Sequence, residues 1–158
     1  MTDQVLLNRN LIERVCVGDI VTRSADLYPE RPAIIDGQRQ LNYRELNDQA
    51  NRLGHALIGL GLKNQDVVAV MARNSLEFLA SYFACAKAGL ICSPVNLALR
   101  SEEVGYCLRD SKARVLIVES VLAPGLTGLP EQLPDLRHIF VTGDERPSLI
   151  KLTGTFDD

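Results

Sequence analysis

Apolar residues recur along the chain at two different spacings, and the spacing changes from segment to segment. Residues 10–27 carry apolar side chains at near-helical spacing, and Tyr28-Pro29 ends this run, because the residue before a proline is pushed out of the helical region. Residues 33–35 and 38–43 are short extended runs on either side of Asp36-Gly37. An Asp-Gly pair between two such runs predicts a β-hairpin.

A long amphipathic helix is predicted next, from about Tyr43 to Leu60. Asn42 can cap its start, and Glu45 three residues later can accept a hydrogen bond from the backbone N–H of the cap. Gly61 follows as a left-handed stop. The apolar stripe of this helix consists of Leu46, Ala50, Leu53, Leu57 and Leu60.

Four apolar runs in the rest of the chain predict strands. Residues 67–71, 90–92 and 115–118 are continuous apolar runs, which fit strands buried on both faces of a parallel sheet. Residues 138–141 are predicted as a last strand, after a proline-containing loop over 120–137. After Gly143 the chain turns polar and no element is predicted.

Two further helices are predicted between these strands. Asn74 and Glu77 have the spacing of a cap at the first helix, and Gly89 is expected to end it in a left-handed conformation. Ser101 is predicted to cap the second helix. Strands and helices therefore alternate after the hairpin, and the expected fold is a three-layer α/β lobe with a mostly parallel sheet.

Composition and charge narrow the classes of partner. Of the 158 residues 46% are hydrophobic and 23% are charged, as in ordinary globular proteins. The net charge of −3 argues against a nucleic-acid partner. The longest apolar stretch, residues 78–95, is interrupted by Lys87, so no transmembrane segment is predicted. Neither a secretory signal nor a C-x-x-C pair is present, so reduced thiols in the cytoplasm are expected for Cys16, Cys85, Cys92 and Cys107.

The sequence contains no motif that would give this chain a catalytic or nucleotide-binding activity of its own. Residues 59–61 begin like a dinucleotide fingerprint, but Asn64 stands where its third glycine belongs. Glu119 and Asp110 are isolated carboxylates in the sequence, and we expect both to be solvated. The aromatic group at 78–83 is more typical of a core than of an acyl tunnel. We therefore predict no catalytic residue, no cofactor-binding residue and no metal ligand in this chain.

Four segments, at residues 41–46, 66–78, 86–96 and 100–117, carry a resemblance to a known family. LNYREL resembles the family pattern L-T/S-Y-x-E-L, and AKAGLICSPVN resembles L-K-A-G followed by proline and an Asn or Asp. The family is that of the AMP-forming acyl-CoA ligases, within the adenylate-forming, AMP-binding superfamily. The positions that match its motifs are Leu41, Tyr43, Glu45, Leu46, Asp66, Asn74, Glu77, Lys87, Ala88, Gly89, Pro94 and Asn96.

The resemblance implies a fold and a reaction for a longer protein. Residues 1–142 would form one lobe of the large N-terminal domain, and residues 143–158 a polar tail before the phosphate loop. The intact ligase would use ATP and Mg²⁺ to convert a carboxylic acid, expected to be a fatty acid, into an acyl-adenylate, and CoA would then displace AMP. The phosphate loop and the catalytic lysine of the family do not occur here, so the chain alone is expected to be inactive. Its partner would be the rest of the ligase, and without it we expect self-association.

Two other functions remain open at this point. Val95-Asn96 favours a CoA ligase, because adenylation domains that load a carrier protein more often have aspartate at the second position. Such an adenylation domain is nevertheless the nearest alternative. A non-catalytic, flavodoxin-like binding module is the alternative from another class, on the fold alone.

Overall fold

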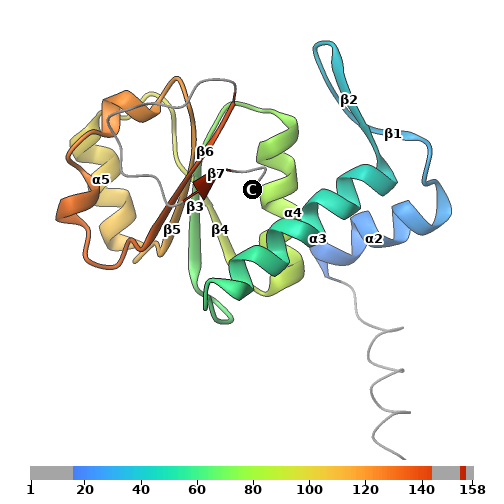
Figure 1. Ribbon diagram of the computed structural model, residues 1–158, viewed down its shortest axis with the longest axis horizontal. Helices are drawn as coiled ribbons and strands as arrows, with labels where there is room; N and C mark the ends of the chain where they lie inside the picture. The colour runs from blue at the N-terminus through green and yellow to red at the C-terminus, as the bar shows by residue number, and fades with distance from the viewer. Residues whose placement is uncertain (1–15, 144–153, 156–158) are drawn as a thin grey trace, which may run out of the picture.

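The computed structural model describes residues 16–143 and 154–155, and it is built around one parallel sheet (Figure 1). Helices lie on both faces of the sheet, and a separate hairpin extends from one end of the molecule. The first elements are α2 (Val17–Leu27), β1 (Pro32–Asp36), β2 (Arg39–Asn42), α3 (Tyr43–Gly59), β3 (Val67–Met71) and α4 (Leu76–Ala88). They are followed by β4 (Ile91–Pro94), α5 (Ser101–Asp110), β5 (Val115–Glu119), two 3₁₀ turns (Ala123–Leu126 and Pro130–Gln132), β6 (His138–Thr142) and β7 (Gly154–Thr155).

The sheet has the order β4-β3-β5-β6-β7, and all of its neighbouring strands are parallel. β3 and β5 are buried on both faces, as their continuous apolar runs predicted. α3 and α4 cover one face with a core that includes Leu57 and Val68. On the other face, α5 and the 3₁₀ turns pack around Val104 and Leu116. The predicted three-layer α/β fold with a mostly parallel sheet is confirmed.

A third core joins α2, the hairpin and the long helices away from the sheet. It contains Val21, Leu46 and Ala80, and Leu41 of β2 packs into it. β1 and β2 pair antiparallel, which confirms the hairpin. The capping box at the start of α3 is also confirmed, because Asn42 Oδ1 accepts from the backbone N–H of Glu45 at 2.8 Å. The Asn42 N–H donates in return to Glu45 Oε2, also at 2.8 Å.

Several local predictions were wrong. Ser75 caps α4 instead of Asn74, with its Oγ accepting from the Phe78 N–H at 3.2 Å. Arg100 is the cap residue of α5, and Ser101 is the first helical residue. At this helix Glu103 accepts from the cap N–H at 2.8 Å, so a glutamate at the third position replaces a hydroxyl cap. At α4, two neighbouring residues could serve as the cap by residue type. The backbone conformation before the helix determines which of the two takes the cap position.

The strand predictions need two further corrections. Ile91 in β4 is 47% exposed, because β4 is an edge strand of the sheet and not a central one. A short strand, β7, pairs with β6 at Phe140 and Val141, although no element was predicted after Gly143. For the helix predicted over 10–27, the structure describes α2 from Val17, and residues 10–15 lie outside the described residues.

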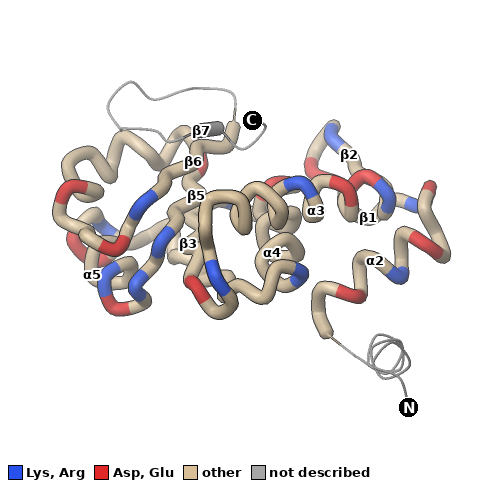
Figure 2. The backbone as a smooth tube through the Cα atoms, turned by 60° about the horizontal axis from the view of Figure 1, so that its bottom comes forward, with Lys and Arg blue, Asp and Glu red and all other residues tan. Residues whose placement is uncertain are grey.

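Charges of both signs are interspersed on α2, α3 and α5, so these helix surfaces are of mixed character (Figure 2). Within residues 16–143 and 154–155, none of the helices has the length and apolar character needed to cross a membrane.

Candidate functional site

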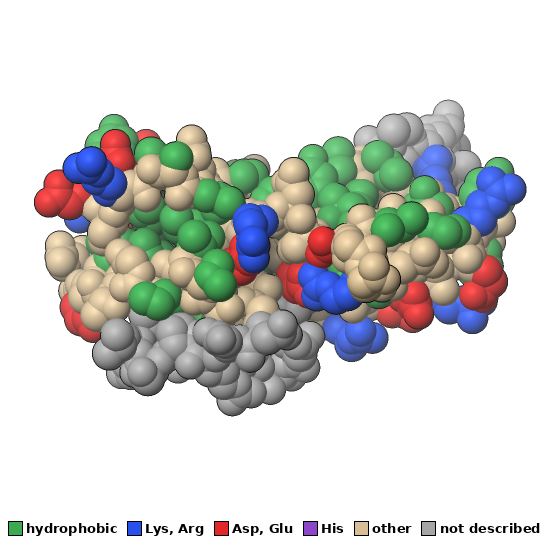
Figure 3. Space-filling model, turned by 90° about the horizontal axis from the view of Figure 1, so that it is seen from above, with side chains coloured by type: hydrophobic (Ala, Val, Ile, Leu, Met, Phe, Trp, Pro, Cys, Tyr) green, Lys and Arg blue, Asp and Glu red, His purple; other side chains and the backbone are tan. Residues whose placement is uncertain are grey.

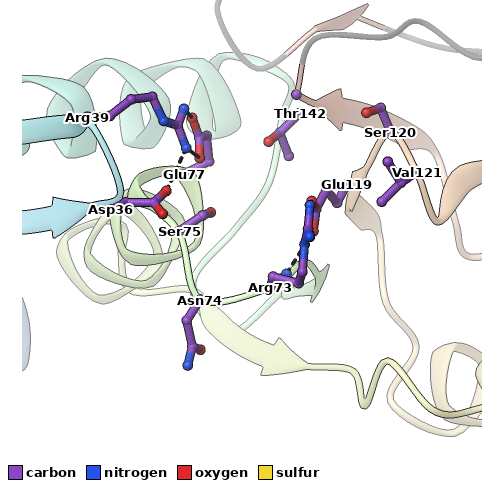
Figure 4. Close-up of a pocket in the computed structure, with 11 residues that line it drawn as sticks. Asp36, Arg39, Arg73, Asn74, Ser75, Glu77, Glu119, Ser120, Val121 and Thr142 are labelled. Atoms are coloured by element: carbon purple, nitrogen blue, oxygen red, sulfur yellow. Dashed lines mark hydrogen bonds and ion pairs between the residues drawn. The ribbon is translucent and has the colours of Figure 1, made fainter.

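An open polar hollow of about 550 Å³ lies at the carboxyl edge of the sheet, between the sheet and the hairpin (Figure 4). It is lined by Asp36, Arg39, Arg73, Asn74, Ser75, Glu77, Glu119, Ser120, Val121, Thr142 and Gly143. The view onto this edge shows charged side chains between two groups of apolar side chains (Figure 3). In open α/β sheets this is the edge at which ligands bind.

The hollow contains the point at which the direction of strand addition reverses. From β3 the chain adds β4 on one side, and then returns to add β5 on the other. Such a reversal leaves a crevice between the first strands of the two directions. Arg73 follows β3 and Glu119 ends β5, so both side chains are placed at this crevice.

Arg73 and Glu119 meet there in an ion pair. Arg73 Nε lies 2.8 Å from Glu119 Oε1, and the guanidinium Nη2 contacts the same oxygen. The backbone N–H of Arg73 also donates to Oε2 at 3.0 Å. The hydrogen bonds from Arg73 hold the pKa of the Glu119 carboxyl below its ordinary value, although partial burial opposes this. The pair therefore bridges the loops that follow β3 and β5.

A second ion-pair group joins the hairpin to the first turn of α4. Arg39 Nη1 lies 2.5 Å from Glu77 Oε1, and Arg39 Nη2 lies 2.7 Å from Asp36 Oδ2. Burial by itself would raise the pKa of Glu77, but the hydrogen bonds, from Arg39 above all, outweigh it and lower the pKa. The hairpin is therefore fastened to the sheet lobe by a charged contact as well as by its apolar face.

The chemistry of the hollow follows from this pairing. Each of the five charged side chains that line it takes part in an ion pair, and the hydrogen bonds from Arg39 and Arg73 lower the pKa of the Glu77 and Glu119 carboxyls. Guanidiniums that are already neutralised attract an anionic substrate weakly. In the part of the chain that the structure describes, no cluster of three or more His, Cys, Asp or Glu side chains is arranged to hold a metal ion. The hollow thus offers a hydrogen-bonding surface with fixed geometry.

Two of the predicted motif positions, Asn74 and Glu77, line this hollow. Lys87 and Gly89 line a different one, of about 520 Å³, between α2, α3 and α4. Lys87 Nζ donates to Asn47 Oδ1 at 2.6 Å and to Thr22 Oγ1 at 2.8 Å, and burial lowers its pKa. Lys87 therefore ties α4 to both neighbouring helices.

The other motif positions lie in turns, caps and the core. Asp66 accepts from the Lys63 N–H at 2.8 Å and from Arg114 Nε at 2.7 Å, which links the starts of β3 and β5. Asn96 accepts from the Ala98 N–H at 3.0 Å and shapes the turn after β4. Tyr43 and Glu45 lie in the first turn of α3, and Pro94 ends β4. Three positions contribute to the cores: Leu41 and Leu46 are buried, and Ala88 packs against the core under α3 and α4.

The expectation that Glu119 is a solvated, isolated carboxylate was wrong. Its side chain is held by Arg73, which lies 46 positions earlier in the chain. The available signal was that each residue follows or ends one of two buried strands, and that carboxyl ends of parallel strands share an edge. Arg39 was also missed, because it belongs to the hairpin and its contact with Glu77 depends on tertiary packing.

Replacing Glu77 with glutamine should destabilise the chain at neutral pH and less so in acid. Because the folded pKa of Glu77 lies below its unfolded value of about 4.3, its contribution is present above that value and is lost as the pH falls through the folded pKa. We expect a loss of about 0.5–1 kcal/mol, or roughly 1–4 °C, at pH 7. Thermal melts of both proteins between pH 7 and pH 3 measure it.

The control for this experiment is Glu131→Gln, which removes the same charge from the 3₁₀ turn Pro130–Gln132. It should lower the melting temperature at pH 7 by less than Glu77→Gln does. A Glu77→Gln deficit that persists unchanged at pH 3 would show that the carboxylate–guanidinium pair is not its cause.

Residues 21–154 match the protein family described as AMP-binding enzyme. A fatty acid–[acyl-carrier-protein] ligase, ScoC, of Streptomyces coeruleorubidus is 36% identical over 107 residues, which are 68% of this chain and 21% of that protein. A medium/long-chain-fatty-acid–CoA/3-oxocholest-4-en-26-oate–CoA ligase of Mycobacterium tuberculosis is 33% identical over 128 residues, 81% of this chain and 23% of that protein. The chain thus spans about a fifth of the length of these relatives.

Solved structures agree with the sequence relatives. The anthranilate CoA ligase AuaEII, in complex with anthranoyl-AMP, matches with a TM-score of 0.78 and 33% identity over 81% of this chain and 25% of that one. A putative long-chain-fatty-acid CoA ligase of Rhodopseudomonas palustris matches with a TM-score of 0.83 and 25% identity, over 92% of this chain and 36% of that one. By its sequence match over residues 21–154 and by its fold, the chain belongs to the family of AMP-binding enzymes, whose relatives here are adenylate-forming acyl ligases.

Proposed function

We propose that this chain is the N-terminal portion of an AMP-forming acyl-CoA ligase that acts on fatty acids. In the whole protein, a carboxylate would attack the α-phosphorus of ATP, giving acyl-AMP and pyrophosphate. The thiol of CoA would then attack the acyl carbon and release AMP. The observation that carries the proposal is the 128-residue match to a ligase named for fatty acids and CoA.

The role of this chain in that reaction is structural support at the carboxyl edge of its sheet. Residues 1–142 would form one lobe of the N-terminal domain, and residues 143–158 would lead towards the phosphate loop. The two ion-pair groups of the hollow would fix the loops after β3 and β5 and the hairpin, so that later segments pack on a rigid surface. ATP, Mg²⁺ and CoA would be bound with residues outside this chain.

The isolated chain is accordingly expected to show no adenylate-forming activity. Every charged group in its carboxyl-edge hollow is paired with another side chain, which leaves it unfit to neutralise a triphosphate. Carboxylate-dependent exchange of pyrophosphate into ATP measures the first half-reaction directly. Exchange above background with the purified chain and a panel of fatty acids would refute the assignment of catalysis to other segments.

A carrier-protein ligase is the second candidate, because one relative favours it. ScoC, which is 36% identical over 107 residues, is named as a fatty acid–[acyl-carrier-protein] ligase. A longer protein containing this chain, supplied with ATP and a fatty acid, should transfer the acyl group to CoA under the first proposal. Transfer to a phosphopantetheinylated carrier protein alone would support the second.

The isolated chain is also expected to self-associate. An exposed apolar stripe runs along α2 and consists of Val17, Ile20 and Leu27. The side chain of Ile20 is 56% exposed and that of Leu27 is 69% exposed. Burial of such surface favours association. Pairing through the edge strand β4 is a weaker route, because Pro94 has no N–H to donate. Light scattering at tens of micromolar should give twice the monomer mass of 17.4 kDa.

The stripe can be tested against another exposed isoleucine. Ile20→Glu should restore the monomer, whereas Ile58→Glu on α3, which is exposed to a similar extent, should leave the association unchanged. A monomer mass for the unmodified chain at all concentrations would reject the prediction.

A further inference from the structure

Two cysteines, Cys85 near the end of α4 and Cys92 in β4, are brought together by the turn between these elements. Gly89 adopts a left-handed conformation with φ of 71° and ends α4. The N–H of Leu90 then donates to the carbonyl of Cys85 at 2.9 Å, so the chain folds back directly over the last turn of the helix. The start of β4 therefore lies beside Cys85.

The side chains of these two cysteines enter the same apolar core. Cys92 is the register partner of Val68 in the neighbouring strand β3, so its side chain lies on the same face of the sheet as Val68, which belongs to the core under α3 and α4. Leu90 and Cys85 belong to the core under α3 and α4, and Cys92 packs against it. Cys85 is 0% exposed, whereas Cys92 is only partly buried.

The two thiols are also chemically different from each other. The Cys85 thiol donates a hydrogen bond to the Cys92 sulfur, which lowers the pKa of Cys92 against the opposing effect of burial. The same contact, together with burial, raises the pKa of Cys85. A thiol with a lowered pKa, partial solvent access and a second thiol beside it has the features of a redox-reactive cysteine.

We propose that Cys92 and Cys85 form a two-cysteine site that is oxidised by hydrogen peroxide. The Cys92 thiolate attacks one peroxide oxygen, forms a sulfenic acid, and releases hydroxide, which takes up the thiol proton as water. The Cys85 sulfur then attacks the sulfenic sulfur, its proton leaves with the hydroxyl group, and a second water is released. Two thiols are thereby oxidised to one disulfide, and one peroxide is reduced to two waters.

The disulfide would close a ring across the turn that contains Lys87 and Gly89. Lys87 holds α4 to α2 and α3 through Thr22 and Asn47. Oxidation would therefore link the end of α4 covalently to β4. This link would lie next to Lys87, which connects α4 to α2 and α3. This consequence goes beyond the proposed ligase function and does not depend on it.

Tryptic mapping can detect this bond, because Lys87 lies between the two cysteines. Cleavage after Arg73, Lys87 and Arg100 places Cys85 in peptide 74–87 and Cys92 in peptide 88–100. The purified chain would be treated with equimolar hydrogen peroxide, alkylated with iodoacetamide without reductant, and digested. We expect a disulfide-linked 74–87/88–100 pair within a single chain, whose mass is lower by two hydrogen atoms, with Cys16 and Cys107 alkylated.

Variants separate the two steps. Cys85→Ser should leave a sulfenic acid on Cys92 that dimedone traps, Cys92→Ser should form no linked pair, and the control Cys107→Ser on α5 should behave like the parent. If a variant fails to fold, initial rates of iodoacetamide labelling in the parent still decide, with Cys92 expected to react faster than Cys107. Full alkylation of Cys85 and Cys92 after peroxide, or faster labelling of Cys107, would overturn the proposal.

Discussion

Replacing Gly89 with valine is expected to lower the melting temperature of the chain by roughly 5–15 °C. Gly89 has φ of 71°, a region that a β-branched residue occupies at a cost of about 1–3 kcal/mol. A Cβ atom at this position would also lie 2.6 Å from Asn64 Oδ1, so the end of that side chain must turn away, which adds a smaller cost. Thermal unfolding followed by circular dichroism measures the sum.

A matched series of Gly→Ala variants separates the two costs. Gly59 lies in α3 without positive φ and with open space around it, so alanine there should be neutral or stabilising. Gly61 has φ of 87° and open space, so its alanine variant reports backbone strain alone. Gly89→Ala should be the most destabilising of the three. Equal melting temperatures for the variants at 61 and 89 would show that Asn64 moves away without cost.

The left-handed conformation of Gly89 was predicted correctly from the neighbouring sequence. The tertiary contacts around Gly89 could not be predicted in this way. A glycine between an apolar helix and an apolar strand indicates a left-handed stop, because only nearby residues are involved. The approach of Asn64 depends on Gln65, whose N–H donates to the Gly89 carbonyl at 2.8 Å. That contact joins the loop before β3 to the turn before β4. It becomes visible once the two strands are known to be neighbours.

The same distinction explains what could be predicted of the candidate site. Asn74 and Glu77 were singled out as motif and capping positions, and both line the hollow. The Arg73–Glu119 pair was missed, because periodicity identifies β3 and β5 as buried strands without saying that they are adjacent. Once β5 is placed beside β3, the two side chains must share the carboxyl edge. The site could therefore not be predicted without knowing the order of the strands in the sheet.

Strand order also bears on the flavodoxin-like alternative. Counted along the chain, the sheet order is 2-1-3-4-5, which is that of flavodoxin-type folds. In this chain an ion pair between Arg73 and Glu119 spans the crevice where such folds place a ligand. The family match over residues 21–154 favours a ligase lobe. Proteins with this strand order can have unrelated functions, so the topology alone does not identify the function. The residues that line the crevice, here Arg73 and Glu119, distinguish one function from another.

Replacing Gly18 with leucine is expected to detach α2 from the rest of the molecule. A Cβ atom on Gly18 would lie 2.9 Å from the backbone nitrogen of Lys87 and 3.0 Å from its Cα. Backbone atoms inside α4 cannot rotate away, so α2 must move as a whole. The shift would also pull Thr22 away from Lys87 Nζ, a contact of 2.8 Å. Overpacking and a lost hydrogen bond to a charged group together cost roughly 3–5 kcal/mol.

Hydrogen exchange can show that this loss is local, because α2 packs against α3 and α4 and belongs to the core that lies away from the sheet. Amides of residues 17–27 should exchange much faster in Gly18→Leu, whereas those of β3 and β5 should keep their protection. Gly54→Ala is the matched control, since its Cβ would meet Ala84 O at an ordinary 3.4 Å. Equal loss of protection in β3 and α2 would mean that the helical part and the sheet unfold as one unit, contrary to this prediction.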